Sequence, residues 1–296
     1  MAFITTKDQV RLHYEDWGTG RPVVLLHGWP LDAASWEYQA LHLAAAGYRV
    51  ITYDRRGFGR SDRPWGGYDY DTLAADLDAL IRALDLHEAA LVGFSMGGGE
   101  VARYLSTYGA ARVSRVVLLA AVTPGLAQAP DRPEGVPGEV FDGLFQALEQ
   151  DRIGFLGAYS KTVFRPDEDE TVNEARRHWY LDMALRASPR AVVETARSWA
   201  GTDFRQDMRA FTIPTLVIHG AEDTSVPPAL AGRASARMIP GARYLEYPQA
   251  GHFLIVDKAA RVTRDVLDFL GSEPAVGEPG AEKVDEGRDL GVDQAA

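Results

Sequence analysis

The sequence of 296 residues contains no cysteine. It therefore cannot form disulfide bonds, and it cannot build zinc sites or iron–sulfur clusters on thiolate ligands. A cysteine nucleophile is excluded for the same reason. The lack of cysteine also fits a reducing compartment, and we expect a cytoplasmic protein.

The sequence also lacks long apolar runs and clusters of basic residues. No uninterrupted apolar stretch approaches the roughly 20 residues that a membrane-spanning helix needs. Residues 1–18 contain no basic segment followed by an apolar run, so no signal peptide is expected. The formal net charge is −11, and no basic cluster could neutralise several phosphates. We therefore expect neither nucleic acid nor membrane surfaces as partners.

What the sequence does contain is a series of short runs rich in Val, Leu and Ile. Continuous runs of this length are typical of parallel strands that are covered on both faces. The expected strands are residues 22–28, 48–54, 89–94, 113–121, 214–220 and 242–248. Before them, residues 11–17 alternate between charged and apolar side chains, which predicts an exposed antiparallel strand. Residues 3–6 are its expected hairpin partner.

Helical patterns separate these strands. The expected helices are residues 35–47, 69–86, 97–109, 227–238 and 257–271. The first has Ser35 as its capping residue and Gly47 as its end, both of which are typical helix signals. Alternation of strands and helices predicts an α/β fold with a mostly parallel, doubly wound sheet of about eight strands and an antiparallel edge.

The alternation of strands and helices fails between residues 123 and 200. A loop rich in Pro and Gly is followed there by three helical segments, at about residues 139–151, 171–187 and 189–200. Because both flanks return to the sheet, we expect a helical cap rather than a separate helical domain. The cap would be residues 124–200, inserted into a core of residues 1–123 and 201–271.

The last segment, residues 272–296, differs in composition from the rest of the chain. It carries seven acidic and two basic side chains and almost no large apolar ones. Such a segment cannot bury enough apolar surface to offset the entropy of ordering it, so we expect an acidic, disordered tail.

Four glycines surround a single serine in the stretch LVGFSMGGGEV, residues 91–101. Its centre matches the pattern G-x-S-x-G, in which a strand turns sharply into a helix and presents the serine as a strained nucleophile. Side chains in place of Gly93 or Gly97 would collide with neighbouring backbone. A simple turn is the alternative, whereas a phosphate-binding loop would need a lysine that is absent. We therefore expect Ser95 to be the nucleophile.

Two further glycines follow the serine pattern directly. Gly98 and Gly99 are not required by the sharp turn itself. We expect them to let the first turn of the helix approach a neighbouring strand or loop closely.

A serine nucleophile needs a general base and an acid that orients it. In enzymes with this pattern the order along the chain is serine, acid, histidine, which excludes the four histidines that precede Ser95. His178 lies in the expected cap, and His219 is too close to the acid candidates to serve as their partner. His252 remains as the base, in a loop between the last strand and the last helix.

The acid is expected directly after the strand at residues 214–220, where the sequence offers both Glu222 and Asp223. Two backbone amides must also stabilise the negative charge that develops on the substrate oxygen. One is the amide that follows the nucleophile, at Met96. The candidate for the other is the amide of Trp29, whose side chain could line the pocket or only cap the core.

Five segments together indicate a family. They are HGWPL (27–31), DRRGFGRS (54–61), GFSMGGGEVARY (93–104), HGAEDTSVP (219–227) and AGH (250–252). In these segments, and over about residues 3–271, the sequence resembles the α/β-hydrolases. More narrowly, it resembles the cofactor-free bacterial haloperoxidases, also known as arylesterases, perhydrolases or non-heme chloroperoxidases.

This resemblance implies an α/β-hydrolase fold and a serine hydrolase of carboxylic esters. It favours Asp223 over Glu222 and so implies a triad of Ser95, Asp223 and His252. It implies oxyanion donors at Trp29 and Met96, which would also contact the substrate. The final acceptor of the acyl group would be water or hydrogen peroxide, and peroxide would yield a peracid that oxidises halide. No metal, haem or other cofactor is implied, and a homo-oligomer is compatible with the resemblance.

Other members of the superfamily provide the alternatives. Dehalogenases and epoxide hydrolases use an aspartate where this chain has Ser95, which disfavours them. A lactonase or a carbon–carbon bond hydrolase would keep the same triad. The alternative from another class is a receptor that binds a small ligand without turning it over.

Overall fold

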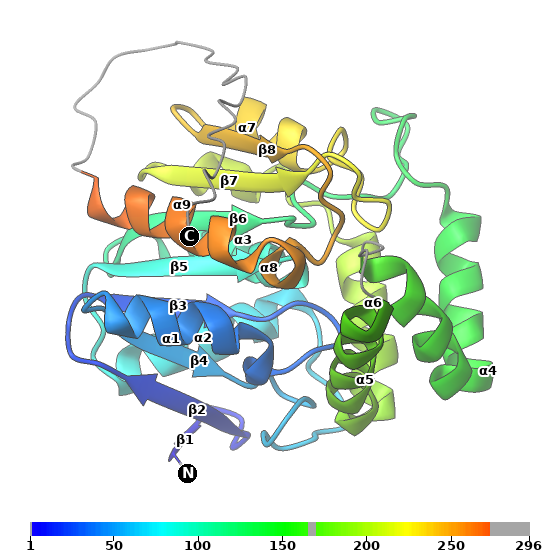
Figure 1. Ribbon diagram of the computed structural model, residues 1–296, viewed down its shortest axis with the longest axis horizontal. Coiled ribbons are helices and arrows are strands. Elements are labelled where there is room, and N and C mark those ends of the chain that lie inside the picture. The colour runs from blue at the N-terminus through cyan, green and yellow to red at the C-terminus, as the bar shows by residue number, and fades with distance from the viewer. Residues whose placement is uncertain (1, 165–169, 273–296) are drawn as a thin grey trace, which may run out of the picture.

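An eight-stranded, mostly parallel sheet forms the centre of the molecule, as the sequence predicts (Figure 1). The computed structural model describes residues 2–164 and 170–272. The order of the strands in the sheet is β1-β2-β4-β3-β5-β6-β7-β8. Their bounds are β1 Ala2–Thr5, β2 Arg11–Trp17, β3 Pro22–Leu26, β4 Arg49–Tyr53, β5 Ala89–Phe94, β6 Val113–Leu119, β7 Thr215–Gly220 and β8 Arg243–Tyr247.

The pairing of the strands confirms the predicted antiparallel edge. The pairs β1–β2 and β2–β4 are antiparallel, and every later pair in the sheet is parallel. Strand β5 lies in the middle, and all six of its residues are buried. Its continuous apolar sequence is therefore that of a strand covered on both faces.

Helices cover both faces of the sheet. Outside the segment between β6 and β7, they are α1 Glu37–Ala45, α2 Tyr70–Ala83, α3 Met96–Tyr108, α7 Gly232–Met238, α8 Leu254–Asp257 and α9 Ala259–Gly271. Helices α1 and α9 contact each other on one face, and α2 and α3 contact each other on the opposite face (Figure 1). Two short 3₁₀ helices, η1 Ala33–Trp36 and η2 Asp207–Ala210, complete the set.

The predicted cap at Ser35 is wrong. A 3₁₀ turn, η1, precedes α1, and its capping residue is Asp32, whose carboxylate accepts a hydrogen bond from the amide of Ala34. Ser35 lies inside that turn, and its hydroxyl donates to the carbonyl of Asp32. The carboxylate takes the capping role because it stands three residues earlier, where the chain first turns.

Two predicted helices near the C-terminus also differ from the structure. Residues 227–231 form turns, in which the amides of Leu230 and Ala231 both donate to the carbonyl of Pro227, so α7 begins only at Gly232. The last predicted helix, residues 257–271, corresponds to α9, which begins two residues later. The short helix α8 before it was not predicted, and the non-helical backbone of Lys258 (φ −124°, ψ 31°) separates the two.

Three long helices form the segment between β6 and β7: α4 Gly138–Val163, α5 Glu170–Arg186 and α6 Pro189–Gly201. Figure 1 shows them together beyond the carboxyl ends of the parallel strands. Helix α4 has a kink at Asp151 (φ −149°, ψ 79°), which coincides with the predicted end of the first helix. The helix resumes after the kink and continues to Val163. The sequence did not predict this second half of α4, because Gly154 and Gly157 are poor helix formers. The predicted acidic tail lies outside the described residues, apart from Ser272.

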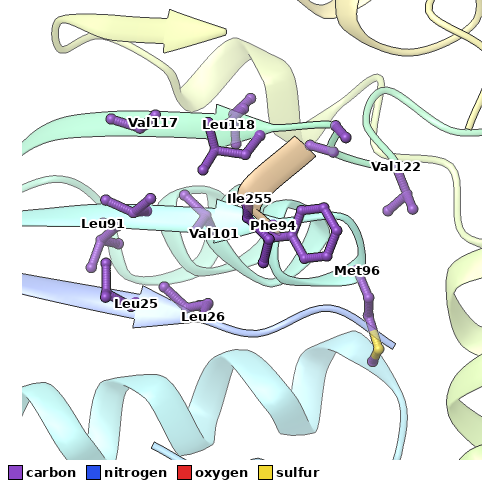
Figure 2. Close-up of a cluster of buried hydrophobic side chains, with 14 of the residues drawn as sticks. Leu25, Leu26, Leu91, Phe94, Met96, Val101, Val117, Leu118, Val122 and Ile255 are labelled. Carbon is purple, nitrogen blue, oxygen red and sulfur yellow. The ribbon is translucent and has the colours of Figure 1, made fainter. Parts of the chain in front are cut away.

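The central strands and α3 are joined by a continuous apolar core. Figure 2 shows Leu26 of β3, Leu91 of β5, Leu118 of β6 and Val101 of α3 among these side chains. All four are fully buried, and burial of each contributes roughly 1.5–3 kcal/mol to stability. The end of β5 is thereby fixed between two neighbouring strands and the helix that follows it.

Candidate active site

Ser95 lies at the sharp turn between β5 and α3, with a strained backbone (φ 53°, ψ −117°). Three backbone hydrogen bonds hold it there. Its amide donates to the carbonyl of Leu119 at 2.9 Å, and its carbonyl accepts from the amides of Val122 at 3.2 Å and Gly98 at 3.0 Å. Such a conformation costs on the order of 1–3 kcal/mol and persists only where the surrounding structure enforces it.

The glycines on either side of Ser95 are required by close backbone contacts. A Cβ on Gly93 would lie 2.7 Å from the carbonyl oxygen of Gly97, and a Cβ on Gly97 would lie 2.4 Å from that of Leu26. Both distances are too short for any real side chain. The steric reason that the sequence predicts for the G-x-S-x-G pattern is therefore present in the structure.

The next two glycines also make close contacts, as expected. A Cβ on Gly98 would lie 2.3 Å from the Cβ of Ala121, in the loop after β6. A Cβ on Gly99 would lie 2.6 Å from the ring of Phe204 and 2.8 Å from that of Tyr70. The first turn of α3 is thus packed directly against its surroundings, and this packing fixes the position of Ser95.

His252 lies between the serine and an acid. Its Nε2 is 3.0 Å from Ser95 Oγ, and its Nδ1 is 2.7 Å from Asp223 Oδ2. Ser95 follows β5, Asp223 follows β7 and His252 follows β8. The carboxyl edge of the sheet therefore brings the three residues together. All three are nearly inaccessible to solvent, with 6% or less of each exposed.

Asp223 is fully satisfied as an ionised carboxylate. Its Oδ1 accepts hydrogen bonds from the amides of Ser225 at 2.9 Å and Val226 at 2.8 Å. Burial raises the pKa of Asp223, but the charge of His252 and the contacts with His219 and His252 outweigh burial, so the pKa lies well below its ordinary value. The neighbouring Glu222 is exposed and does not take this place.

The structure corrects the expectation for His219. Its side chain does reach the acid: Nε2 lies 3.2 Å from Asp223 Oδ2, and both side chains are completely buried. The chain turns back on itself after β7, because the amide of Asp223 donates to the carbonyl of Gly220. Because of this turn, the side chains of His219 and Asp223 can meet although the two residues are only four positions apart in the sequence. His178, by contrast, is exposed on α5.

The loop after β3 passes directly beside Ser95. A Cβ on Gly28 would lie 3.2 Å from the Cβ of Ser95. Within residues 2–164 and 170–272, neither the amide of Trp29 nor that of Met96 donates to a protein acceptor. The amide of Met96 directly follows the serine in the chain, and that of Trp29 directly follows Gly28.

The side chain of Trp29 connects this loop to the helices above it. Its Nε1 donates to the carbonyl of Val192 in α6 at 2.9 Å. Its ring packs against Tyr159 of α4 and Trp199 of α6, at centroid distances of 5.9 and 5.8 Å. The hydroxyl of Tyr159 in turn donates to Ser225, and burial raises the pKa of Tyr159 to about 12, so the group stays neutral.

A buried ion pair supports the same loop from below, and the sequence did not indicate it. Arg55 pairs with Glu100 of α3, and its guanidinium donates to the carbonyl of His27 at 2.9 Å. The amide of Arg55 donates to His27 Nε2 at 3.1 Å. Burial, together with the charge of Arg55, lowers the pKa of His27 to about 3 and keeps it neutral. The sequence signal for this ion pair was the segment DRRGFGRS, residues 54–61, which contains Arg55. The sequence alone could not show that Arg55 pairs with Glu100.

Known proteins that are similar in sequence identify the family of this chain. The sequence matches the family described as alpha/beta hydrolase fold over residues 21–259. The chain belongs to the α/β-hydrolase family. It is 41% identical over 275 residues to a non-heme chloroperoxidase of Kitasatospora aureofaciens, covering 91% of this chain and 99% of the relative.

Two further relatives place this α/β-hydrolase within the family. A bifunctional esterase/perhydrolase of Acinetobacter calcoaceticus is 34% identical over 278 residues, with 92% of this chain and all of the relative covered. The crystal structure of a bromoperoxidase from Bacillus anthracis has a TM-score of 0.88 and 43% identity, and covers 92% of this chain and 99% of its own. The resemblance to the haloperoxidase and esterase group is confirmed.

Metal-binding clusters and membrane-spanning helices are both absent from the part of this α/β-hydrolase that the structure describes. Among the residues that the structure describes, no cluster of three or more His, Asp or Glu side chains is arranged to hold a metal ion. No helix in that part of the chain has the length and apolar character needed to span a membrane.

Proposed function

We propose that this α/β-hydrolase is a serine hydrolase that cleaves small carboxylic esters through an acyl-enzyme on Ser95. The observation that carries the proposal is the position of His252, whose ring nitrogens lie 3.0 Å from Ser95 Oγ and 2.7 Å from Asp223 Oδ2. A serine hydroxyl needs a base at this distance to act as a nucleophile. The esterase/perhydrolase among the relatives supports the ester class.

In the first half of the reaction, Ser95 Oγ attacks the carbonyl carbon of the ester and its proton passes to His252 Nε2. The ionised Asp223 stabilises the imidazolium that forms. The bond between the carbonyl carbon and the alcohol oxygen then breaks, and His252 returns the proton to the departing alcohol. The products of this half are the free alcohol and an acyl ester on Ser95.

Negative charge develops on the carbonyl oxygen during this attack. The amides of Met96 and Trp29 would stabilise the charge, since Met96 follows Ser95, Trp29 follows the adjacent Gly28, and neither amide donates to another described group. The amide of Met96 also begins α3, where the helix dipole favours negative charge. Such donors typically contribute a factor of about 10²–10³ each to kcat.

In the second half, His252 removes a proton from the acceptor, which attacks the acyl carbon and releases Ser95. Water as the acceptor gives a carboxylic acid. Hydrogen peroxide gives a peracid, which oxidises halide in solution. The non-heme chloroperoxidase and esterase/perhydrolase relatives support this second activity, and neither half of the reaction requires a metal or haem.

We propose that residues 124–200 are a cap over the core. Substrate would reach Ser95 beneath the helices of this cap, which lie between β6 and β7. The side chains nearest the loop at Trp29 are aromatic, including Tyr159 and Trp199. An apolar acyl or aryl group would pack favourably against them. Trp29 and Met96 would contact this group as well as donate to its carbonyl.

A substitution at Ser95 tests the proposal. With p-nitrophenyl acetate as the substrate, the Ser95→Ala variant should lose at least about 10³-fold in kcat. Hydrolysis at a rate near that of the wild type would overturn the proposal. A ligand-binding receptor of the same fold would show no turnover even as the wild type, and a panel of lactones beside linear esters would identify a lactonase.

The remaining expectations concern partners and location. Small-molecule esters with water or peroxide are the proposed reactants. The absence of nucleic-acid and membrane partners and the cytoplasmic location stay predictions from the sequence, which is also compatible with a homo-oligomer.

A further inference from the structure

A second buried histidine lies against the acid of the proposed triad. His219 ends β7, and its Nε2 is 3.2 Å from Asp223 Oδ2, the same oxygen that contacts His252 Nδ1 at 2.7 Å. The His219 and Asp223 side chains are both fully buried. The catalytic scheme above uses His252 and leaves His219 without a role.

The hydrogen bonding of His219 determines where its proton resides. Nε2 lies 2.8 Å from the carbonyl oxygen of Val226, which can only accept, so Nε2 carries the proton and donates it. Nδ1 has no hydrogen-bond partner among the described residues. A proton on Nδ1 would be a buried donor without an acceptor, so the hydrogen bonding favours Nε2 over Nδ1 as the site of the ring proton.

This one N–H group therefore connects two parts of the acid loop. It donates to the Val226 carbonyl, and the positive end of its dipole lies close to Asp223 Oδ2. The amide of the same Val226 donates to Asp223 Oδ1 at 2.8 Å. Oδ1 is thus held by two backbone amides and Oδ2 by two imidazole rings.

The ring of His219 is itself held tightly. A Cβ added to Gly232, at the start of α7, would lie 2.6 Å from His219 Nδ1 and 2.8 Å from its Cβ. The glycine therefore allows α7 to pack directly on the imidazole. A buried ring in such a site has a single orientation, which is what a positioning group requires.

We infer that His219 is a positioning residue that holds Asp223 so that Oδ2 faces Nδ1 of His252. This inference rests on the proposed function, since it assigns His219 a part in the same triad. His219 does not contact the substrate or exchange protons with it. It acts through Asp223, by fixing both the carboxylate and the peptide that follows it.

A pair of amide substitutions at position 219 tests this inference. In His219→Gln the side-chain nitrogen can reach the position of the imidazole Nε2, whereas in His219→Asn it ends one methylene short. We expect kcat for ester hydrolysis to fall about 10- to 100-fold in His219→Asn, with KM nearly unchanged. The Gln variant should recover most of this loss. Equal kcat in the wild type and in His219→Asn would overturn the inference.

A second measurement separates positioning from a general structural role. If His219 acts through Asp223, adding His219→Asn to Asp223→Asn should change kcat by no more than about twofold, because interacting residues are not additive. A further loss as large as in the wild-type background would contradict the inference. The Ile218→Ala variant, in the same buried strand, is the control: its melting temperature should fall while its kcat stays unchanged.

Two further variants, Gly232→Ala and Ser95→Ala, complete the test. If His219→Asn does not fold, Gly232→Ala replaces it, since the added Cβ must displace the ring, and unchanged kcat there would overturn the inference. Ser95→Ala distinguishes the two proposals. Hydrolysis by Ser95→Ala would reject the proposed function itself, whereas an inactive Ser95→Ala with a fully active His219→Asn would reject only the role of His219.

Discussion

Ser95 adopts a backbone conformation that serine rarely takes, and its neighbours maintain it. The positive φ of 53° is stabilised by hydrogen bonds to Leu119 and Val122. Glycines at positions 93 and 97 remove the side chains that would otherwise collide there. The residue that we propose as the nucleophile is thus held in a strained conformation.

The His252→Ala variant should lose about 10⁴-fold or more in kcat, because Ser95 then has no base at hydrogen-bond distance. Combining it with Ser95→Ala should add little to the loss, since the triad acts as a unit. Steady-state kinetics with p-nitrophenyl acetate measures both effects. A loss of only a few fold in His252→Ala would mean that another group is the base.

The ionisation of Asp223 predicts how stability depends on pH. The pKa of this carboxyl is lower in the folded protein than in the unfolded chain, so its charge contributes stability above the unfolded value of about 4. That contribution is lost as the pH falls through the lower, folded value. Asp223→Asn should therefore be less stable than the wild type at pH 7, with a smaller difference near pH 3. Urea unfolding at the two pH values measures this, and a difference that grows toward pH 3 would contradict it.

Most of the proposed triad could be predicted from the sequence, because order along the chain and strand ends are sequence properties. Ser95 and His252 followed from the order of motifs, and the choice of Asp223 over Glu222 needed the family resemblance. The contact between His219 and Asp223 could not be predicted, since it depends on a turn that reverses the chain within four residues.

The loop after β3 and helix α6 form one connected element around the nucleophile. Trp29 joins them, through its indole hydrogen bond to Val192 and its contact with Trp199. The same residue would donate its backbone amide to the substrate oxygen. Movement of α6 would therefore be transmitted to the oxyanion site.

The Trp29→Phe variant keeps an aromatic ring but removes the hydrogen bond to α6. A hydrogen bond of this kind contributes about 1 kcal/mol, so we expect kcat to fall roughly fivefold. Trp65→Phe is the matched control, because 78% of Trp65 is exposed and its ring lies over Arg190, and its kcat should not change. Equal kcat in both variants would show that the link to α6 has no effect on catalysis.

Helix α3 depends on close packing at its first turn. Gly98→Ala would bring a Cβ to 2.3 Å from that of Ala121, and overpacking of this kind costs about 1–3 kcal/mol. The control is Gly157→Ala in α4, where nothing lies within 4 Å of the added Cβ. That variant should gain about 0.5–1 kcal/mol, since alanine is the better helix former. Chemical denaturation measures both, and a stabilised Gly98→Ala would contradict the packing argument.

Element boundaries were predicted well for the strands and less well for the helices. Runs of Val, Leu and Ile mark buried strands directly, and β5 matches its predicted range. Helix ends depend on capping and tertiary contacts instead. Asp32 displaced Ser35 as a cap, and α4 continued past its kink despite Gly154 and Gly157.

The whole sheet is what assembles the site. Ser95 and His252 are separated by 157 residues, yet the parallel strands β5, β7 and β8 end at the same edge. The three helices between β6 and β7 lie beyond that edge (Figure 1). The bromoperoxidase of known structure has a similar fold, with a TM-score of 0.88.

Covalent labelling of the intact protein tests the central claim most directly. After incubation with a fluorophosphonate, which phosphonylates activated serines with loss of fluoride, peptide mass spectrometry should find one adduct, on Ser95. Ser95→Ala should remain unlabelled and inactive toward p-nitrophenyl acetate. An adduct at another residue, or hydrolysis by Ser95→Ala at a rate near that of the wild type, would contradict the account.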